Sequence, residues 1–149
     1  MEIRLLTTSD SKHLFELLND ARPDYIGYFT PFKVEQAAIS NMLASVTSDR
    51  YWGIFHDSTL TGFFMLRGFD AGYKRPSYGV FIAEVFAGNG LLKLSLNYVR
   101  SWCRLNGVGN LMLKVHPDNT VARRSYEAFG FSEEGFDEKN GNIMYNLKV

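Results

Sequence analysis

Two short stretches of the sequence combine residue types that could bind a charged ligand and donate a proton. The first, residues 84–92, holds Gly88 and Gly90 directly before an apolar helical pattern. Glycines allow a backbone to approach a ligand closely, and the free N–H groups at the start of a helix favour anions such as phosphate. No Gly-Lys-Ser/Thr and no third glycine follow, so the stretch is neither a Walker loop nor a good dinucleotide fingerprint. Two glycines alone are also consistent with a plain tight turn.

The second stretch, residues 113–131, places a tyrosine on the apolar face of a short predicted helix. Ala122 and Tyr126 lie one turn apart on that face, and Asn119 can cap the start of the helix. Gly130 stands where a left-handed C-cap is expected. A buried phenol needs a partner for its hydroxyl, so Tyr126 is either a satisfied core residue, which spacing alone favours, or a group that takes part in chemistry.

The elements that position these stretches follow from hydrophobic periodicity and from capping and stop signals. Helices are predicted between the capping cluster 8–11 and Pro23, over 33–46, from 91 to Asn106-Gly107, and from 119 or 120 to Gly130. Strands are predicted at 3–5, 51–56, 60–67, 77–83, 110–115, 131–136 and 143–149. This mixed order predicts an α+β fold in which helices pack on one sheet, in a single domain over residues 1–149.

Composition narrows the classes of protein and partner. The 149 residues carry 16 Lys and Arg against 16 Asp and Glu, so net charge gives no argument for nucleic acid or an acidic membrane surface. Cys103 is the only cysteine, which excludes an internal disulfide and a cysteine-based metal site. No apolar run suits a signal peptide or a membrane span. We expect a soluble, cytoplasmic protein without a metal, a nucleic-acid partner or a membrane partner.

Aromatic side chains crowd into the predicted loop 22–32, where Tyr25, Tyr28 and Phe29 stand close together. The simpler interpretation is a satellite hydrophobic cluster under a loop. The functional alternative is one wall of a pocket for an acceptor, because loops often carry specificity.

The two stretches together resemble the GNAT superfamily of N-acetyltransferases. The element order resembles that family over nearly the whole chain, and the motifs lie in residues 80–96 and 113–131. The second motif is the more specific and matches at Leu113, Val115, Asn119, Ala122, Tyr126, Glu127, Gly130 and Phe131. The first departs from the family, which has Arg or Gln where this chain has Ala87 and a small residue where it has Leu92. Lys93, Arg123 or Arg124 could compensate for the lost side chain.

The resemblance implies a central mixed, mostly antiparallel sheet of about six to seven strands, with helices on both faces and a splay between the fourth and fifth strands. It also implies acetyl-CoA as acyl donor, lying in that splay, with a backbone N–H near Ile82 or Ala83 polarising the thioester carbonyl. The cofactor-binding residues that it implies are Phe81, Ile82, Ala83, Ala87, Gly88, Asn89, Gly90, Leu91, Leu92, Asn119, Ala122 and Tyr126.

The implied reaction is direct transfer of the acetyl group to a primary amine of a small molecule, an amino sugar or a peptide. Tyr126 is the candidate general acid for the departing thiolate, and Glu84 is the first choice of general base. Tyr78, His56 or a water chain are alternative bases. Tyr25, Tyr28 and Phe29 are the candidate acceptor-binding residues.

A second function class stays open at this point. Because Ala87 and Leu92 depart from the family pattern, the chain could be a non-catalytic GNAT-fold module that binds acyl-CoA or regulates another protein. A GNAT-like fold that binds no CoA is the third interpretation. Dimers are common in the superfamily, so a homodimer also stays open, although no residue demands one.

Overall fold

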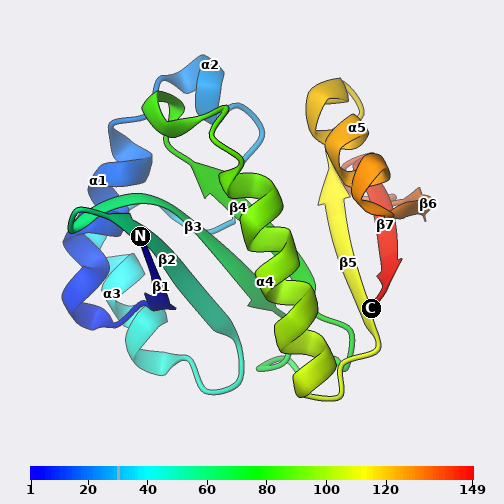
Figure 1. Cartoon of the computed structure of the whole chain (residues 1–149), viewed down its shortest axis with the longest axis horizontal. Helices are drawn as coiled ribbons and strands as arrows, with labels where there is room; N and C mark the ends of the chain where they lie inside the picture. Colours follow the sequence, from blue (N-terminus) through cyan, green and yellow to red (C-terminus); the bar gives the residue numbers. More distant parts are fainter. Residues whose placement is uncertain (30) are drawn as a thin grey trace.

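The computed structural model describes residues 1–29 and 31–149, and its centre is a sheet of seven strands (Figure 1). The strands lie in the order β1-β2-β3-β4-β5-β7-β6, and every neighbouring pair is antiparallel except β4 and β5. Their bounds are Glu2–Leu5 for β1, Arg50–His56 for β2, Thr59–Arg67 for β3, Ser77–Ile82 for β4, Asn110–Val115 for β5, Ser132–Phe136 for β6 and Ile143–Lys148 for β7. The predicted mixed, mostly antiparallel sheet is confirmed.

The helices are α1 (Ser11–Asn19), α2 (Pro23–Ile26), α3 (Gln36–Ser45), α4 (Leu91–Leu105) and α5 (Thr120–Phe129), with short 3-10 turns at Thr8–Asp10 and Glu84–Phe86. Sequence periodicity missed α2, in which Pro23 begins a helix instead of ending the previous one. The sequence prediction also started α3 three residues too early. Within the described residues, no helix combines the length and apolar character that crossing a bilayer requires.

The sheet is covered on both faces, so its strands carry two hydrophobic cores. On one face, Trp52 and Ile54 of β2 pack with the apolar stripe of α4, which crosses the front of the sheet in Figure 1. On the other face, Tyr51 and Phe55 pack with α1, α3 and the aromatic loop after α2. The alternation along β2 follows from the two-residue period of a strand. Each core therefore fixes one side of the same strands.

The parallel pair in the sheet is almost unzipped. Only Ser77 of β4 and Met112 of β5 are in register, and the N–H of Met112 donates to the carbonyl of Pro76 at 3.0 Å. Beyond this point the two strands diverge, and their C-terminal ends point apart at the top of Figure 1. The predicted splay between the fourth and fifth strands is confirmed. It leaves the edge of β4 without a strand partner over most of its length.

A polar network holds α5 against the far side of the splay. The hydroxyl of Tyr145 on β7 donates to the Glu127 carboxylate at 2.7 Å and accepts from the Arg123 guanidinium at 3.1 Å. The helix ends at Gly130, whose φ of 123° lies in the region that favours glycine. This anchoring explains why a Tyr-Glu-x-x-Gly-Phe sequence fixes the orientation of Tyr126.

Candidate functional site

A cleft of about 1010 Å³ fills the splay between β4 and β5. Its walls come from the free edge of β4, the loop 87–90 (here named the Gly loop) with the start of α4, the end of β5 and the inner side of α5. The lining includes Phe81, Ile82, Ala87, Gly88, Gly90, Leu91, Leu92, Asn119, Ala122 and Tyr126. Most of the residues predicted to bind a cofactor therefore meet in one cavity.

The Gly loop presents free backbone donors at the start of α4. Gly88 and Gly90 both have φ of 78°, and a Cβ at either would meet no atom within 4 Å. The left-handed backbone, and not a lack of space, is thus what selects glycine here. The N–H of Leu94 makes the first helical hydrogen bond, to Gly90, so those of residues 91–93 have no helical acceptor. Such a group of N–H donors at a helix N-terminus suits an anion such as a pyrophosphate.

The hydrogen bonds along β4 decide which of its N–H groups is available to donate to a thioester carbonyl. The N–H of Ala83 already donates to the carbonyl of Thr61 at 2.9 Å. Because hydrogen-bonded and non-hydrogen-bonded pairs alternate in an antiparallel ladder, the N–H and carbonyl of Ile82 face away from β3, toward the splay. The Ile82 carbonyl accepts a hydrogen bond from the Tyr25 hydroxyl at 2.7 Å. Of the two predicted donors, the N–H of Ile82 is the one that makes no hydrogen bond within the described residues.

Tyr126 lies on the opposite wall with a protonated and uncommitted hydroxyl. Its ring packs edge-on against Tyr78 at 6.3 Å and Phe131 at 5.8 Å between ring centroids. Burial raises the pKa of Tyr126 to about 12, so the phenol keeps its proton at neutral pH. In the described part of the chain, no other group forms a hydrogen bond with this hydroxyl. Tyr126 is therefore not the core tyrosine with a hydrogen-bonded hydroxyl that the spacing alone favoured.

Tyr78 and Cys103 have structural roles. The Tyr78 hydroxyl donates to Ser95 at 2.7 Å, because the Ser95 hydroxyl itself donates to the carbonyl of Leu92. Burial raises the pKa of Tyr78 well above its ordinary value, so it is a poor base. Burial also raises the pKa of Cys103 to about 11, which is consistent with a core thiol and not a nucleophile.

Other predicted residues lie at the margin of the cleft or outside it. The Asn119 side chain accepts from the N–H of Ala122 at 3.4 Å and caps α5 while lining the cleft. The Asn89 amide donates to the carbonyls of Phe86 and Ala87 and does not line the cleft. His56 is exposed beside Asp57 and lines neither this cleft nor the side pocket described below.

Two cations on α4 line the cleft. Lys93 was among the predicted compensating residues, whereas Arg100, two turns further along the same helix, was missed. The Arg100 guanidinium lies 4.7 Å from the centre of the Phe129 ring and donates to Asn97 at 2.8 Å. Arg123 is instead engaged by Tyr145 and by the carbonyl of Pro117. The seven-residue spacing of Lys93 and Arg100 on one helix face could have identified this pair.

The aromatic loop belongs partly to the core and partly to the cleft. Phe29 packs against Phe63 and Phe81, with ring centroids 5.8 and 5.5 Å apart, so the predicted satellite cluster exists. Tyr28 stacks on His116 with 3.7 Å between ring centroids and 4° between planes. This stack joins the loop to the end of β5 across the mouth of the cleft. Sequence reasoning assigned no functional role to His116.

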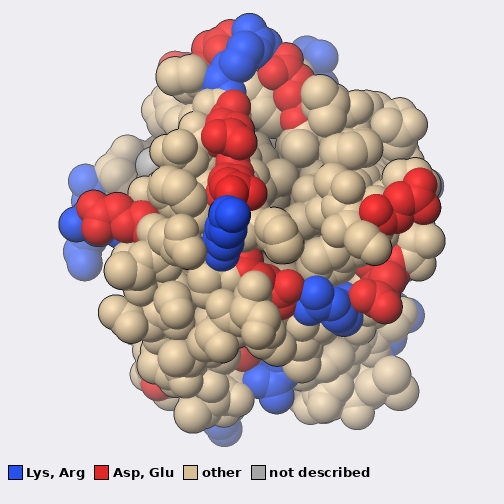
Figure 2. Space-filling model, turned by 90° about the vertical axis from the view of Figure 1, so that its left-hand side faces the viewer, with Lys and Arg blue, Asp and Glu red and all other residues tan. Residues whose placement is uncertain are grey.

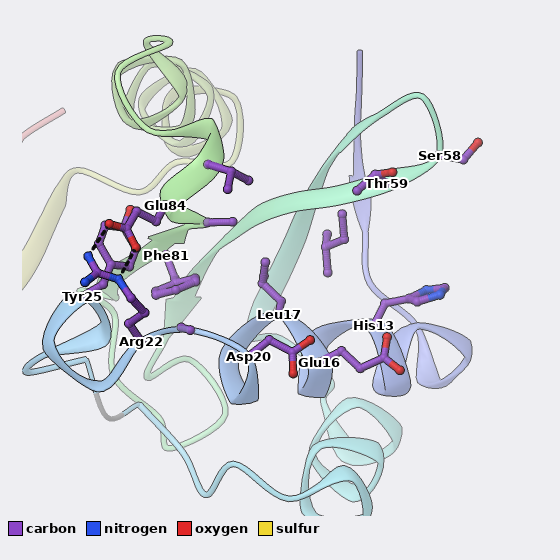
Figure 3. A pocket seen from close by; sticks show the side chains of 14 residues that line it. His13, Glu16, Leu17, Asp20, Arg22, Tyr25, Ser58, Thr59, Phe81 and Glu84 are labelled. Carbon is purple, nitrogen blue, oxygen red and sulfur yellow. Dashed lines mark hydrogen bonds and ion pairs between the residues drawn. The ribbon is translucent and has the colours of Figure 1, made fainter.

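A second, smaller cavity of about 560 Å³ adjoins the cleft (Figure 3). Tyr25 and Phe81 line both cavities, while Ala83 and Glu84 line the smaller one, here named the side pocket. The Glu84 carboxylate accepts from the Arg22 guanidinium at 2.9 and 2.5 Å. This ion pair lowers the pKa of Glu84, so the carboxylate is ionised at neutral pH.

Among the described residues, no group of three or more His, Cys, Asp or Glu side chains is arranged to hold a metal ion. The donors that line the cleft are backbone N–H groups, amides, hydroxyls and cations. This donor set fits an anionic organic ligand with a long apolar part.

Comparison with known proteins places these features in context. A family model described as "Acetyltransferase (GNAT) family" matches residues 12–131. No curated protein matches the sequence. Three solved structures share the fold: a PaiA N-acetyltransferase from Thermoplasma acidophilum in complex with coenzyme A (22% identity, 99% of this chain and 98% of that one, TM-score 0.80), an acetyltransferase from Thermus thermophilus (19%, 99% and 96%, 0.79) and a GNAT-family acetyltransferase from Streptococcus pneumoniae (19%, 99% and 99%, 0.75).

Proposed function

Because the chain belongs to the GNAT acetyltransferase family, we propose that it transfers an acetyl group from acetyl-CoA directly to a primary amine. The observation that carries this proposal is the arrangement across the splay. The free N–H of Ile82 lies on one wall, and the uncommitted hydroxyl of Tyr126 lies on the other. A similar fold from T. acidophilum is described in complex with coenzyme A, which supports the choice of ligand.

The residues of the cleft fit that ligand from end to end. The N–H groups of residues 91–93 would hold the pyrophosphate, with Lys93 beside them and Arg100 two turns further along α4. The free edge of β4 would pair with the amides of the pantetheine arm, much as an added strand pairs with a sheet edge. Leu92 lines the cleft without closing it. The loss of Arg or Gln at Ala87 weakens the site and does not abolish it, because backbone donors remain.

In the proposed reaction, each residue either donates a hydrogen bond or transfers a proton. Bound acetyl-CoA supplies an acetyl group activated as a thioester. The N–H of Ile82 donates to the thioester oxygen as negative charge develops there. Tyr126 holds the proton that the departing sulfur needs, and the amine nitrogen takes the place of that sulfur on the acetyl carbon. Glu84, ionised at the rim of the side pocket, accepts the proton that the amine loses.

The test has two steps. Isothermal titration calorimetry with acetyl-CoA comes first, and a panel of primary amines with detection of free thiol follows. We expect acetyl-CoA to bind and at least one amine to release thiol well above the rate of hydrolysis without amine. Failure to bind acetyl-CoA would refute the proposal.

A non-catalytic acyl-CoA-binding module is the second candidate, favoured by Ala87 and Leu92 at positions where the family has other residue types. The same experiment separates the two. Binding of acetyl-CoA without thiol release by any amine in the panel would support the module and contradict the transferase.

A further inference from the structure

The cleft is lined by residues from both faces of the sheet. On one face, Ala122 and Tyr126 of α5 pack against the core that α4 covers. On the other face, Phe29 and Phe81 pack in the core that α1 and α3 cover, and both residues also line the cleft. The cleft therefore passes through the splay. A cofactor held by the Gly loop and α5 would occupy the first face, which leaves the second face for the acceptor.

Two aromatic rings bridge the splay where β4 and β5 end. Tyr28 follows α2, and the hydrogen bond from Tyr25 to the carbonyl of Ile82 ties α2 to the end of β4. His116 directly follows the last residue of β5. The rings of Tyr28 and His116 are parallel within 4°, with 3.7 Å between their centroids. This stack therefore lies at the same end of the splay as the N–H of Ile82 that we assign to the thioester oxygen.

One face of the Tyr28 ring is open. His116 covers the other face, and the N–H of Asp118 donates to Nδ1 of His116 at 3.1 Å, which holds the imidazole in place. Tyr28 is nevertheless 56% exposed and lines the cleft, as does the exposed Val121 at the start of α5. An open aromatic face beside a cavity suits a second flat ring, because paired aromatic rings attract each other beyond the effect of the area that they bury.

The cleft and the side pocket differ in charge. Among the residues that the structure describes, no carboxylate lines the cleft, whereas Glu16, Asp20 and Glu84 line the side pocket. Acidic side chains also run down the middle of the face that Figure 2 shows, which is the side of the molecule with α1 and the β2–β3 turn. An acceptor whose body is apolar and uncharged therefore suits the cleft better than the side pocket.

We propose that the acceptor is a primary amine joined by a short aliphatic linker to an aromatic ring, and that this ring stacks on the open face of Tyr28. This inference rests on the proposed transferase function and names the acceptor class for the same site. The amine nitrogen forms its bond to the acetyl carbon as the carbon–sulfur bond breaks. The proton of the amine passes to Glu84, and the sulfur takes the proton of Tyr126.

A matched pair of amines isolates the stacking. 2-Phenylethylamine and 2-cyclohexylethylamine share the linker and the ring size, but only the first has a flat aromatic ring. With acetyl-CoA saturating, kcat/KM is measured for both amines in the wild type and in Tyr28→Leu, which keeps apolar bulk and removes the aromatic ring. Intrinsic differences between the two amines cancel in this comparison. We expect the phenyl-to-cyclohexyl ratio of kcat/KM to be about fivefold higher in the wild type than in the variant.

Further variants separate the Tyr28 ring from other effects. Tyr28→Phe should keep the wild-type ratio, because the ring remains. His116→Phe should keep it as well, since a ring still supports Tyr28 and only the titratable group is lost. Tyr73→Leu removes another exposed tyrosine, which lines neither cavity, and serves as the matched control. Thermal unfolding would verify that the fold of each variant is intact.

The outcomes separate this inference from the function on which it rests. If Tyr28→Leu keeps the wild-type ratio, or if Tyr73→Leu lowers the ratio as much, the acceptor inference is wrong and the transferase proposal stands. A polyamine, an amino sugar or a peptide N-terminus with a higher kcat/KM than every aromatic amine would likewise overturn the acceptor class alone. If acetyl-CoA binds and no amine of the pair or of the wider panel releases thiol, both are wrong.

Discussion

At Tyr126, burial raises the pKa of the hydroxyl to about 12, and this protonated phenol is the general acid that we propose. Its ring packs against Tyr78 and Phe131, and the residue lines the cleft. Sequence spacing identified the position of Tyr126 on the inner face of α5. It could not show whether the hydroxyl would find a partner, because any partner would come from a distant part of the chain.

Tyr126→Phe keeps the ring and removes the donor. We expect kcat to fall about a hundredfold, because the sulfur must leave without a proton, while the dissociation constant of acetyl-CoA stays the same. Steady-state kinetics and calorimetry measure the two quantities. With the pKa of Tyr126 at about 12, kcat of the wild type should show no alkaline decline from this group below about pH 10. Unchanged kcat in the variant would exclude Tyr126 from the chemistry.

At Ala87, a substitution should strengthen the site instead of weakening it. Ala87→Arg restores a cation at the Gly loop, where it can form a charge-assisted hydrogen bond to a phosphate. We expect acetyl-CoA to bind about tenfold more tightly, as measured by calorimetry. Ala44→Arg adds the same charge on the exposed side of α3 and should leave the affinity unchanged. Equal effects of both variants would show that only net charge matters.

The Glu84 carboxylate provides a test by pH. Its folded-state pKa is lowered by the hydrogen bonds and charge of Arg22, so the ion pair contributes stability above the ordinary pKa, and this contribution is lost as pH falls through the lowered value. If Glu84 is the base, Arg22→Gln should move the acid limb of kcat/KM to higher pH. A limb that stays in place in Arg22→Gln would show that another group titrates.

The Gly loop and α4 together form the proposed anion site, and the periodic pattern of α4 made this helix easy to predict from sequence. Its stripe of Leu96, Val99 and Cys103 is continuous over several turns. The four-residue helix α2 was missed because so short a segment has no period to detect. The splay was expected only from the family resemblance, since no local pattern in β4 or β5 encodes a missing ladder.

Gly90→Ala tests the loop as an element. Because a Cβ at Gly90 meets no atom within 4 Å, the expected loss of about 1–2 kcal/mol of unfolding free energy comes from its positive φ alone. Acetyl-CoA affinity should fall as well, because the N–H groups turn away from the ligand. Gly109→Ala is the matched control, since its Cβ is also unobstructed and its φ is not in that range. Urea unfolding and calorimetry report the two effects.

The fold brings into contact segments that lie far apart in the sequence, and local sequence patterns cannot predict such contacts. The side pocket takes residues from α1, the β2–β3 turn and the end of β4, which are separated by dozens of residues. The resemblance supplied the cofactor cleft, because its motifs lie along the chain. Nothing comparable pointed to the side pocket, because the α1 residues that line it look like ordinary residues of an amphipathic helix.

Acetyl-CoA should protect the open edge of β4 from hydrogen exchange. The amides of Val80 and Ile82 face the splay, so we expect the pantetheine arm to slow their exchange. The amide of Ala83 already donates to Thr61 and is the internal control. The same ligand at about a hundredfold excess over its dissociation constant should add about 2.7 kcal/mol to the unfolding free energy. Exchange of Val80 and Ile82 that acetyl-CoA leaves unchanged would place the ligand elsewhere.

The single in-register pair between β4 and β5 also has a mechanical meaning. The N-terminal strand lies on one side of that junction, and the C-terminal strand lies on the other. Tension applied through the two termini would therefore load a seam with little backbone bonding, and the sheet would part there before its hairpins yield. A ligand that contacts β4 on one side and α5 on the other would reinforce this seam, so the force at first rupture would report occupancy of the cleft.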